Sequence, residues 1–131
     1  MTQENKDLLL RDLCARLPYK TKIQLTEYSD LTGEKLPSKI KTLDYCTLGK
    51  AQAYCKGFRK DEIKPYLFPL SSMTEEQSME FALLQVNTHK DGFLYVCDCA
   101  NMMKWLLKNH FDIYGLIEKG LAIDGSGLNI Y

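Results

Sequence analysis

Aromatic side chains that lie next to cations along the chain are the residues of this sequence best suited to bind a ligand. The chain has eight tyrosines, five phenylalanines and one tryptophan. A flat aromatic face can stack on a nucleotide base while a neighbouring lysine or arginine binds its phosphate. A first candidate cluster consists of Arg11, Arg16, Tyr19, Lys20 and Lys22, and the first four of these are the ligand-binding candidates. A second consists of Tyr66, Trp105 and Tyr114, with His110 as a further ligand-binding candidate. Ordinary core packing is the alternative for each aromatic residue.

His110 and Asp112 are the candidates for acid–base chemistry. A carboxylate beside an imidazole raises the pKa of the imidazole and selects its tautomer. The alternative is a histidine that ends a helix and an aspartate that forms a turn. The sequence has no phosphate-binding glycine loop, nucleophile elbow, metalloprotease helix or kinase motifs. We therefore expect a protein that is not an enzyme, with a small enzyme using His110 and Asp112 as an alternative.

The cysteines predict neither a metal site nor a disulfide framework. Cys97 and Cys99 are separated by one residue, whereas structural zinc sites use cysteine pairs separated by two to four residues and need a second pair. The number of cysteines is odd, and their spacing is irregular: Cys14, Cys46, Cys55, Cys97 and Cys99. We expect reduced thiols, as in a cytosolic protein, and no metal or cofactor.

Length and charge indicate one domain, residues 1–131, of 15.1 kDa. We expect no membrane span, because no apolar run is long enough for one. Residues 1–65 hold 13 Lys and Arg against 9 Asp and Glu, and residues 66–131 hold 4 against 8, so the two parts carry +4 and −4. Either the chain folds back on itself or unlike surfaces meet in a homo-oligomer. Binding to long nucleic acid is not expected, because it usually needs a larger basic excess.

The elements that position these residues can be read from the apolar pattern. Leu9, Leu10, Leu13 and Leu17 form one stripe of a helix that stops before Pro18, so Arg16, Tyr19 and Lys20 should project from its end. The stretches "KTKIQLTEY", "KIKTLDYC" and "QAYCKGF" predict three strands of a meander. "YLFPL" follows in extended form, and its two neighbouring prolines indicate an edge strand or a lid over the sheet.

The second half of the chain predicts helices. Thr74 and Gln77 match a capping box. The helix that it starts should bury Met79, Ala82, Leu83 and Val86. "FLYVC" fits a short strand or a buried connector, and Asp98 can cap a third helix that buries Cys99, Met102, Met103 and Leu106. The expected fold is α+β: an N-terminal helix, a small antiparallel sheet or partly closed barrel, and C-terminal helices.

Three blocks of the sequence carry a resemblance: "LLLRDLCARLPY", "IKPYLFPLSSMTEEQ" and "HFDIYGLIEKGLAI". Together they resemble a family of small uncharacterised proteins encoded by phages and prophages of anaerobic gut bacteria. The blocks span about a third of the chain. Members of that family often read Asp-Tyr-Arg-Gly where this chain has Asp112, Ile113, Tyr114 and Gly115. An anionic site built on that arginine is therefore not implied here, and the resemblance implies a phage-like setting.

These observations predict a non-enzymatic, phage-type accessory binding protein in the cytoplasm of the bacterial host cell. Its expected ligand is a nucleotide-like host immune signal, which it would sequester in an anti-defence role. The alternative is a protein-interaction module that inhibits or adapts a host protein through an apolar face around "YLFPL". The partners implied are thus a nucleotide-like small molecule or a host protein.

Overall fold

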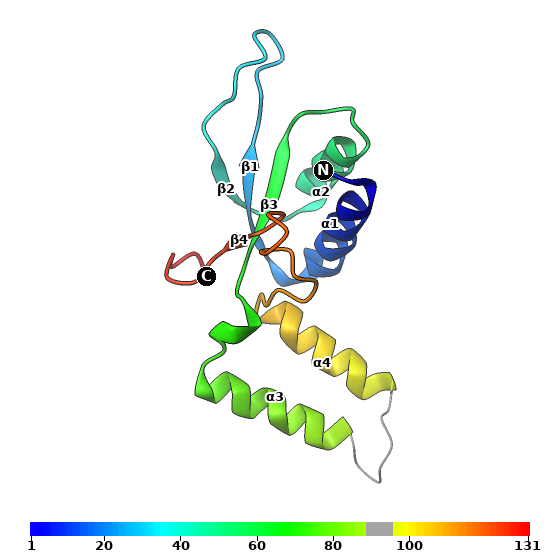
Figure 1. Cartoon of the computed structure of the whole chain (residues 1–131), viewed down its shortest axis with the longest axis vertical. Coiled ribbons are helices and arrows are strands. Elements are labelled where there is room, and N and C mark those ends of the chain that lie inside the picture. Colours follow the sequence, from blue (N-terminus) through cyan, green and yellow to red (C-terminus); the bar gives the residue numbers. More distant parts are fainter. Residues whose placement is uncertain (89–95) are drawn as a thin grey trace.

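The computed structural model describes residues 1–88 and 96–131, with side chains described for residues 1–84 and 100–131. Helices lie against a sheet of four strands in the order β2-β1-β3-β4 (Figure 1). Its strands are β1 (Lys22–Thr26), β2 (Lys39–Thr42), β3 (Glu62–Leu67) and β4 (Ile123–Asp124). β1 pairs antiparallel with β2 and β3, whereas β4 runs parallel to β3. The α+β class is confirmed, but the sheet is mixed and does not close into a barrel.

The N-terminal helix α1 (Gln3–Arg16) forms where the leucine stripe predicts it. The side chain of Thr2 caps the helix by accepting a hydrogen bond from the backbone N–H of Asn5 at 3.1 Å. Leu9 and Leu13 are buried against the sheet core. The short 3₁₀ helix η1 (Leu17–Tyr19) then extends the turn, since proline is tolerated at its start.

The stretch predicted as a third strand, residues 52–58, forms the end of a helix, α2 (Tyr45–Cys55), and the turn that follows it, so the predicted meander is wrong. Asp44 and Thr47 form a reciprocal capping box that starts this helix. Thr47, Ala51 and Cys55 are its buried residues, and their spacing of four is helical rather than that of a strand. α2 packs beside α1 on the same side of the sheet (Figure 1).

β3 is an inner strand, which corrects the predicted edge strand or lid. It lies between β1 and β4, and Tyr66 and Leu67 are buried. Pro65 is accommodated because β4 pairs with β3 only from Tyr66 onward. Pro69 then precedes the 3₁₀ helix η2 (Leu70–Ser72).

The capping box of α3 (Glu75–Thr88) is confirmed. Thr74 Oγ1 accepts from the Gln77 N–H at 3.1 Å, and Gln77 Oε1 accepts from the Thr74 N–H at 3.0 Å. α3 and α4 (Val96–Lys108) lie side by side and extend away from the sheet (Figure 1). The prediction that α3 buries Met79 and Leu83 is wrong, because 68% and 64% of their surfaces are exposed. In the described part of α3, Phe81 faces α4 and stacks on Trp105, whereas Met79 and Leu83 remain in contact with solvent.

α4 also differs from its prediction. It begins at Val96, so Asp98 lies inside its first turn and does not precede it. Met103 is 41% exposed, and Leu107 is the buried leucine. The side chains of Val86 and Cys99, and residues 93–95 of "FLYVC", lie outside the described part.

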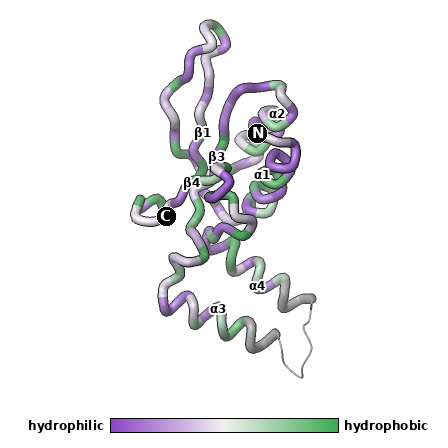
Figure 2. The backbone as a smooth tube through the Cα atoms, in the orientation of Figure 1, coloured by the Kyte–Doolittle hydropathy of each residue, from purple (hydrophilic) through white to green (hydrophobic). Residues whose placement is uncertain are grey.

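The hydrophobic core lies between the sheet and the first two helices. Its fully buried members include Leu13, Ile23, Leu25, Leu67 and Leu116. The loop from α2 to β3 is strongly hydrophilic and passes near the start of α1 (Figures 1 and 2). In the described part of the chain, no helix combines the length and the apolar character that crossing a membrane requires.

Candidate functional site

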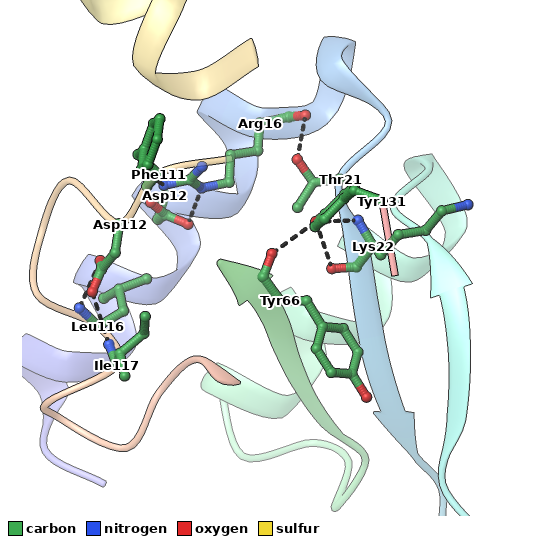
Figure 3. Close-up of polar contacts among 10 residues, drawn as sticks. All are labelled: Asp12, Arg16, Thr21, Lys22, Tyr66, Phe111, Asp112, Leu116, Ile117 and Tyr131. Atoms are coloured by element: carbon green, nitrogen blue, oxygen red, sulfur yellow. Dashed lines mark hydrogen bonds and ion pairs between the residues drawn. The ribbon is translucent and has the colours of Figure 1, made fainter. Parts of the chain in front are cut away.

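Arg16 is buried, which corrects the prediction that its side chain projects from the end of the helix. Its side chain is 0% exposed, and its Nε donates to Asp12 Oδ2 at 2.7 Å. Its Nη2 donates to the carbonyl oxygen of Phe111 at 2.6 Å. Figure 3 shows the guanidinium directed toward both groups. Arg16 has this place because the spacing of four residues puts Asp12 and Arg16 together on the inner face of α1.

The rest of the first predicted cluster does not form a site with Arg16. Arg11 and Lys20 are exposed, and Tyr19 is half-buried. Lys20 adopts a left-handed backbone conformation with φ 54° at the end of η1. None of these residues lines the two neighbouring pockets described below.

The aromatic residues of the second predicted cluster contribute to packing at separate places. Tyr66 is buried in β3, and its carbonyl oxygen accepts a hydrogen bond from the Tyr131 hydroxyl at 2.7 Å. Trp105 stacks on Phe111 at 5.8 Å between ring centroids and donates from Nε1 to Glu80. Tyr114 packs against the hydrophobic core.

His110 and Asp112 have different partners and are not hydrogen-bonded to each other. Both carboxylate oxygens of Asp112 accept backbone N–H groups, from Leu116 at 2.9 Å and from Ile117 at 3.0 Å. The His110 ring stacks on Tyr131 with 3.7 Å between centroids. Burial, together with the charge of Arg16, lowers the pKa of His110 to about 4. The structure therefore does not contain the predicted acid–base pair.

A different set of cations and aromatics surrounds a pocket of about 430 Å³ at the start of α1. We call it the basic–aromatic pocket, and it is lined by Met1, Lys6, Tyr28, Tyr54, Gly57, Arg59 and Lys60. Lys6 comes from α1, Tyr28 from the segment after β1 and Tyr54 from α2, while the remaining cations come from the loop before β3. None of the lining residues is acidic. Such a pocket combines flat apolar faces with positive charge.

The end of α2 fixes the backbone of the loop that supplies the cations. The N–H of Gly57 donates to the carbonyl of Tyr54 at 3.0 Å, and the N–H of Phe58 donates to that of Ala53 at 2.9 Å. These two bonds define a Schellman motif, and Gly57 has the required positive φ of 80°. In this motif the residue after the glycine often packs back on the helix. Phe58 instead leaves 80% of its surface exposed.

Arg59 is held in place by a buried carboxylate. Its Nε donates to Asp61 Oδ2 at 2.7 Å, and the Asp61 side chain is 3% exposed. The hydrogen bond and charge of Asp61 raise the pKa of Arg59 above its usual range. The Arg59 side chain itself is 45% exposed, and its terminal nitrogens make no hydrogen bond within the described part of the chain. A guanidinium oriented in this way can offer its remaining donors to an anion.

The sequence reading missed this pocket although it looked for the same residue types. The segment from Tyr54 to Asp61, "YCKGFRKD", contains aromatics, cations and a turn glycine. The prediction of a strand for residues 52–58 hid the signal, since a strand would place alternate side chains on opposite faces. Lys6 and Tyr28 are far away in the sequence, and nothing local connects them to the loop.

The described cysteines are all free thiols: Cys14 and Cys46 are exposed, and Cys55 is buried. The side chains of Cys97 and Cys99 lie outside the described part. Among the described residues, no group of three or more histidine, cysteine or acidic side chains could hold a metal ion.

Comparison with known proteins gives no match: no family model, no curated protein and no solved structure matches this chain.

Proposed function

We propose that this chain is a non-enzymatic binding protein that holds a small, nucleotide-like anion in the basic–aromatic pocket. The observation that carries the proposal is the meeting of three cations, Lys6, Arg59 and Lys60, with two tyrosines around one hollow without an acidic residue. Phosphate is recognised by such cations, and arginine can bind it with two parallel hydrogen bonds. A nucleotide ring can lie against the tyrosine faces.

The size of the pocket supports a small ligand. Its volume of about 430 Å³ falls in the range of roughly 300–1,000 Å³ that is usual for small-molecule sites. The lining residues include no serine, cysteine or histidine that could serve as a nucleophile or base. We therefore favour capture of the ligand over its conversion. The proposed role is sequestration of a host immune signal in the bacterial cytoplasm, in line with the resemblance to phage-encoded proteins.

Calorimetric titration of the intact protein with linear and cyclic nucleotides tests the proposal. Arg59→Ala and Lys60→Ala should each weaken binding roughly 10- to 100-fold, because each removes a charged hydrogen bond to the anion. The matched control is Arg11→Ala with Lys20→Ala, which removes two exposed cations outside the pocket. The control should bind as the wild type does. Absence of heat with every nucleotide, or equal losses in control and pocket variants, would contradict the proposal.

A second candidate function is docking of a host protein on α3. Leu70, Met79 and Leu83 lie on or just before this helix and are 49%, 68% and 64% exposed, and exposed apolar groups of this kind mark interaction surfaces. Its test begins with identification of a host protein that the wild type captures. Titration with the purified partner should then show a loss of about tenfold or more for Met79→Ser with Leu83→Ser. Ile40→Ser, at an exposed position on β2, is the control.

A further inference from the structure

We infer that the ligand is a guanine nucleotide whose base occupies a second hollow beside the basic–aromatic pocket, an inference that rests on the proposed function. This hollow, which we call the Phe58 hollow, has a volume of about 420 Å³. It shares a wall with the basic–aromatic pocket, formed by Tyr28, Gly57, Arg59 and Lys60. One ligand can therefore place its anionic group among the cations of the pocket and its ring in the hollow, where Tyr28 of the shared wall and Phe58 are the aromatic lining residues.

Phe58 provides the stacking surface for the ring. Its backbone is fixed by the Schellman motif at the end of α2, and its side chain is 80% exposed at the hollow. A large aromatic side chain held at this exposure costs little entropy when it receives a base, because its backbone is already ordered. Stacking by itself does not distinguish bases, since every base has a flat face.

Asp30 provides the selectivity for one base over the others. Three residues with oxygen-bearing side chains line the hollow, besides the tyrosine of the shared wall: Ser29, Asp30 and Asp61. The Ser29 hydroxyl oxygen already accepts the N–H groups of Leu31 and Thr32, and Asp61 is bonded to Arg59. The Asp30 carboxylate makes no hydrogen bond within the described part of the chain. Asp30 lines the same hollow as Arg59, the cation that would hold the phosphate.

The chemistry of an ionised carboxylate selects guanine. Such a group can only accept hydrogen bonds, and its two oxygens can accept two parallel N–H donors. The edge of guanine offers a ring N–H and an adjacent amino group. Uracil offers one N–H between two carbonyl oxygens, which a carboxylate repels. Adenine places a ring acceptor next to its amino group. Asp30 therefore matches guanine better than the other bases.

Calorimetric titration with GMP, IMP and UMP tests the inference. IMP keeps the ring and phosphate of GMP but lacks the amino group, so GMP should bind about tenfold or more tightly than IMP, and UMP should bind still more weakly. Asp30→Asn should reduce the ratio of GMP to IMP affinity to near one, because the amide cannot accept both donors. Lys60→Ala, which acts on the phosphate, should weaken all three nucleotides by a similar factor.

The outcomes separate this inference from the proposed function. Equal affinity for GMP and IMP, or a ratio unchanged in Asp30→Asn, would overturn the guanine assignment, while loss of binding in Arg59→Ala would still support the pocket. No binding of any nucleotide would overturn both. Asp30 is exposed, so circular dichroism and thermal melting should show that the variant folds as the wild type does.

Discussion

At the scale of single residues, the buried pair of Asp12 and Arg16 is the most consequential interaction. Both side chains are 0% exposed, and their only mutual bond joins Nε to Oδ2. Burial raises the pKa of Asp12 although Arg16 acts in the opposite direction. Asp12 Oδ1 and Arg16 Nη1 have no hydrogen-bond partner among the described residues. The pair is thus costly to bury, and its two groups depend on each other.

Removal of one member of the Asp12–Arg16 pair should lower the free energy of unfolding more than replacement of both members. We expect Asp12→Ala to lower the free energy of unfolding by about 3–5 kcal/mol, because it leaves the Arg16 charge buried without a counter-ion. The double variant Asp12→Leu with Arg16→Met should lose clearly less, since it buries no charge. Urea denaturation of the wild type, Asp12→Ala and the double variant checks this expectation. It would be contradicted if the double variant were the least stable of the three.

His110 should make the stability of the protein depend on pH. Its pKa is lowered from 6.5 to about 4 in the folded protein, so the unfolded chain binds a proton at a higher pH than the folded one. Stability is therefore full above pH 6.5 and falls as the pH drops toward 4. Between pH 7 and pH 5 the free energy of unfolding should fall by about 1–2 kcal/mol. This value allows for solvent screening, because the ring is only partly buried.

The variant His110→Asn isolates this effect. Asparagine tolerates the positive φ of 63° at this position and does not titrate. Denaturation at pH 7 and pH 5 should show a smaller loss for the variant than for the wild type. An identical loss in both proteins would assign the pH dependence to other groups.

At the scale of elements, the helix ends determine where the side chains of the proposed site lie. The capping box of α2 turns the segment after β2 into a helix, and the Schellman motif ends it at Gly57. The loop that follows carries Arg59 and Lys60 to the basic–aromatic pocket and Phe58 to the Phe58 hollow. The path of this loop thus depends on the left-handed conformation of Gly57.

Gly57→Ala should destabilise the protein by about 1 kcal/mol, because alanine is strained at a φ of 80°. An added Cβ would meet no atom within 4 Å, so the cost comes from the backbone alone. The matched control is Gly49→Ala inside α2, which also meets no atom and should stabilise the helix by roughly 0.5–1 kcal/mol. Thermal denaturation measures both changes. Equal effects of the two variants would show that Gly57 does not end the helix as described.

At the scale of the whole molecule, no ion pair among the side chains that the structure describes joins the basic half of the sequence to the acidic half. The three ion pairs among described residues all lie within residues 1–65: Asp12 with Arg16, Glu27 with Lys50, and Arg59 with Asp61. The reading in which the basic half folds onto the acidic half gains no support from them. Association of unlike surfaces in a homo-oligomer stays a prediction.

The C-terminal segment connects distant parts of the molecule. The Tyr131 hydroxyl accepts from the N–H of Lys22 at 2.8 Å and donates to the carbonyl of Tyr66 at 2.7 Å (Figure 3). Burial raises the pKa of Tyr131 to about 12, so the hydroxyl keeps its proton under ordinary conditions. This one group therefore holds the segment against both β1 and β3.

Tyr131→Phe should lower the free energy of unfolding by about 1–3 kcal/mol, because it leaves the buried Tyr66 carbonyl without its partner. The control is Tyr45→Phe, since Tyr45 is 82% exposed and its hydroxyl makes no hydrogen bond in the described part of the chain. Chemical denaturation should show a change for the first variant only. If both variants unfolded at the wild-type midpoint, the C-terminal segment would be held by packing of the Tyr131 ring alone.

The sequence by itself determined the elements whose signals are local. The leucine stripe of α1, the alternation of Ile23 and Leu25 in β1 and the capping box of Thr74 and Gln77 all depend on neighbours within a few residues. The α+β class follows from them. The sequence predicts a strand and a turn in the α2 segment because tyrosines and a glycine are typical of them, whereas the buried residues Thr47, Ala51 and Cys55 have the helical spacing of four.

The tertiary structure alone decided which charged residues are buried and which meet at a pocket. The buried guanidinium of Arg16 has one partner from its own helix, Asp12, and one from far along the chain, the carbonyl of Phe111. Lys6, Tyr28 and Arg59 come together because α1, β1 and α2 converge at one end of the sheet. Amino-acid types indicate which chemistry a residue can perform, but its neighbours depend on contacts between distant segments. No local pattern records those contacts, which is why the sequence suggested the same residue types at positions other than those that line the basic–aromatic pocket.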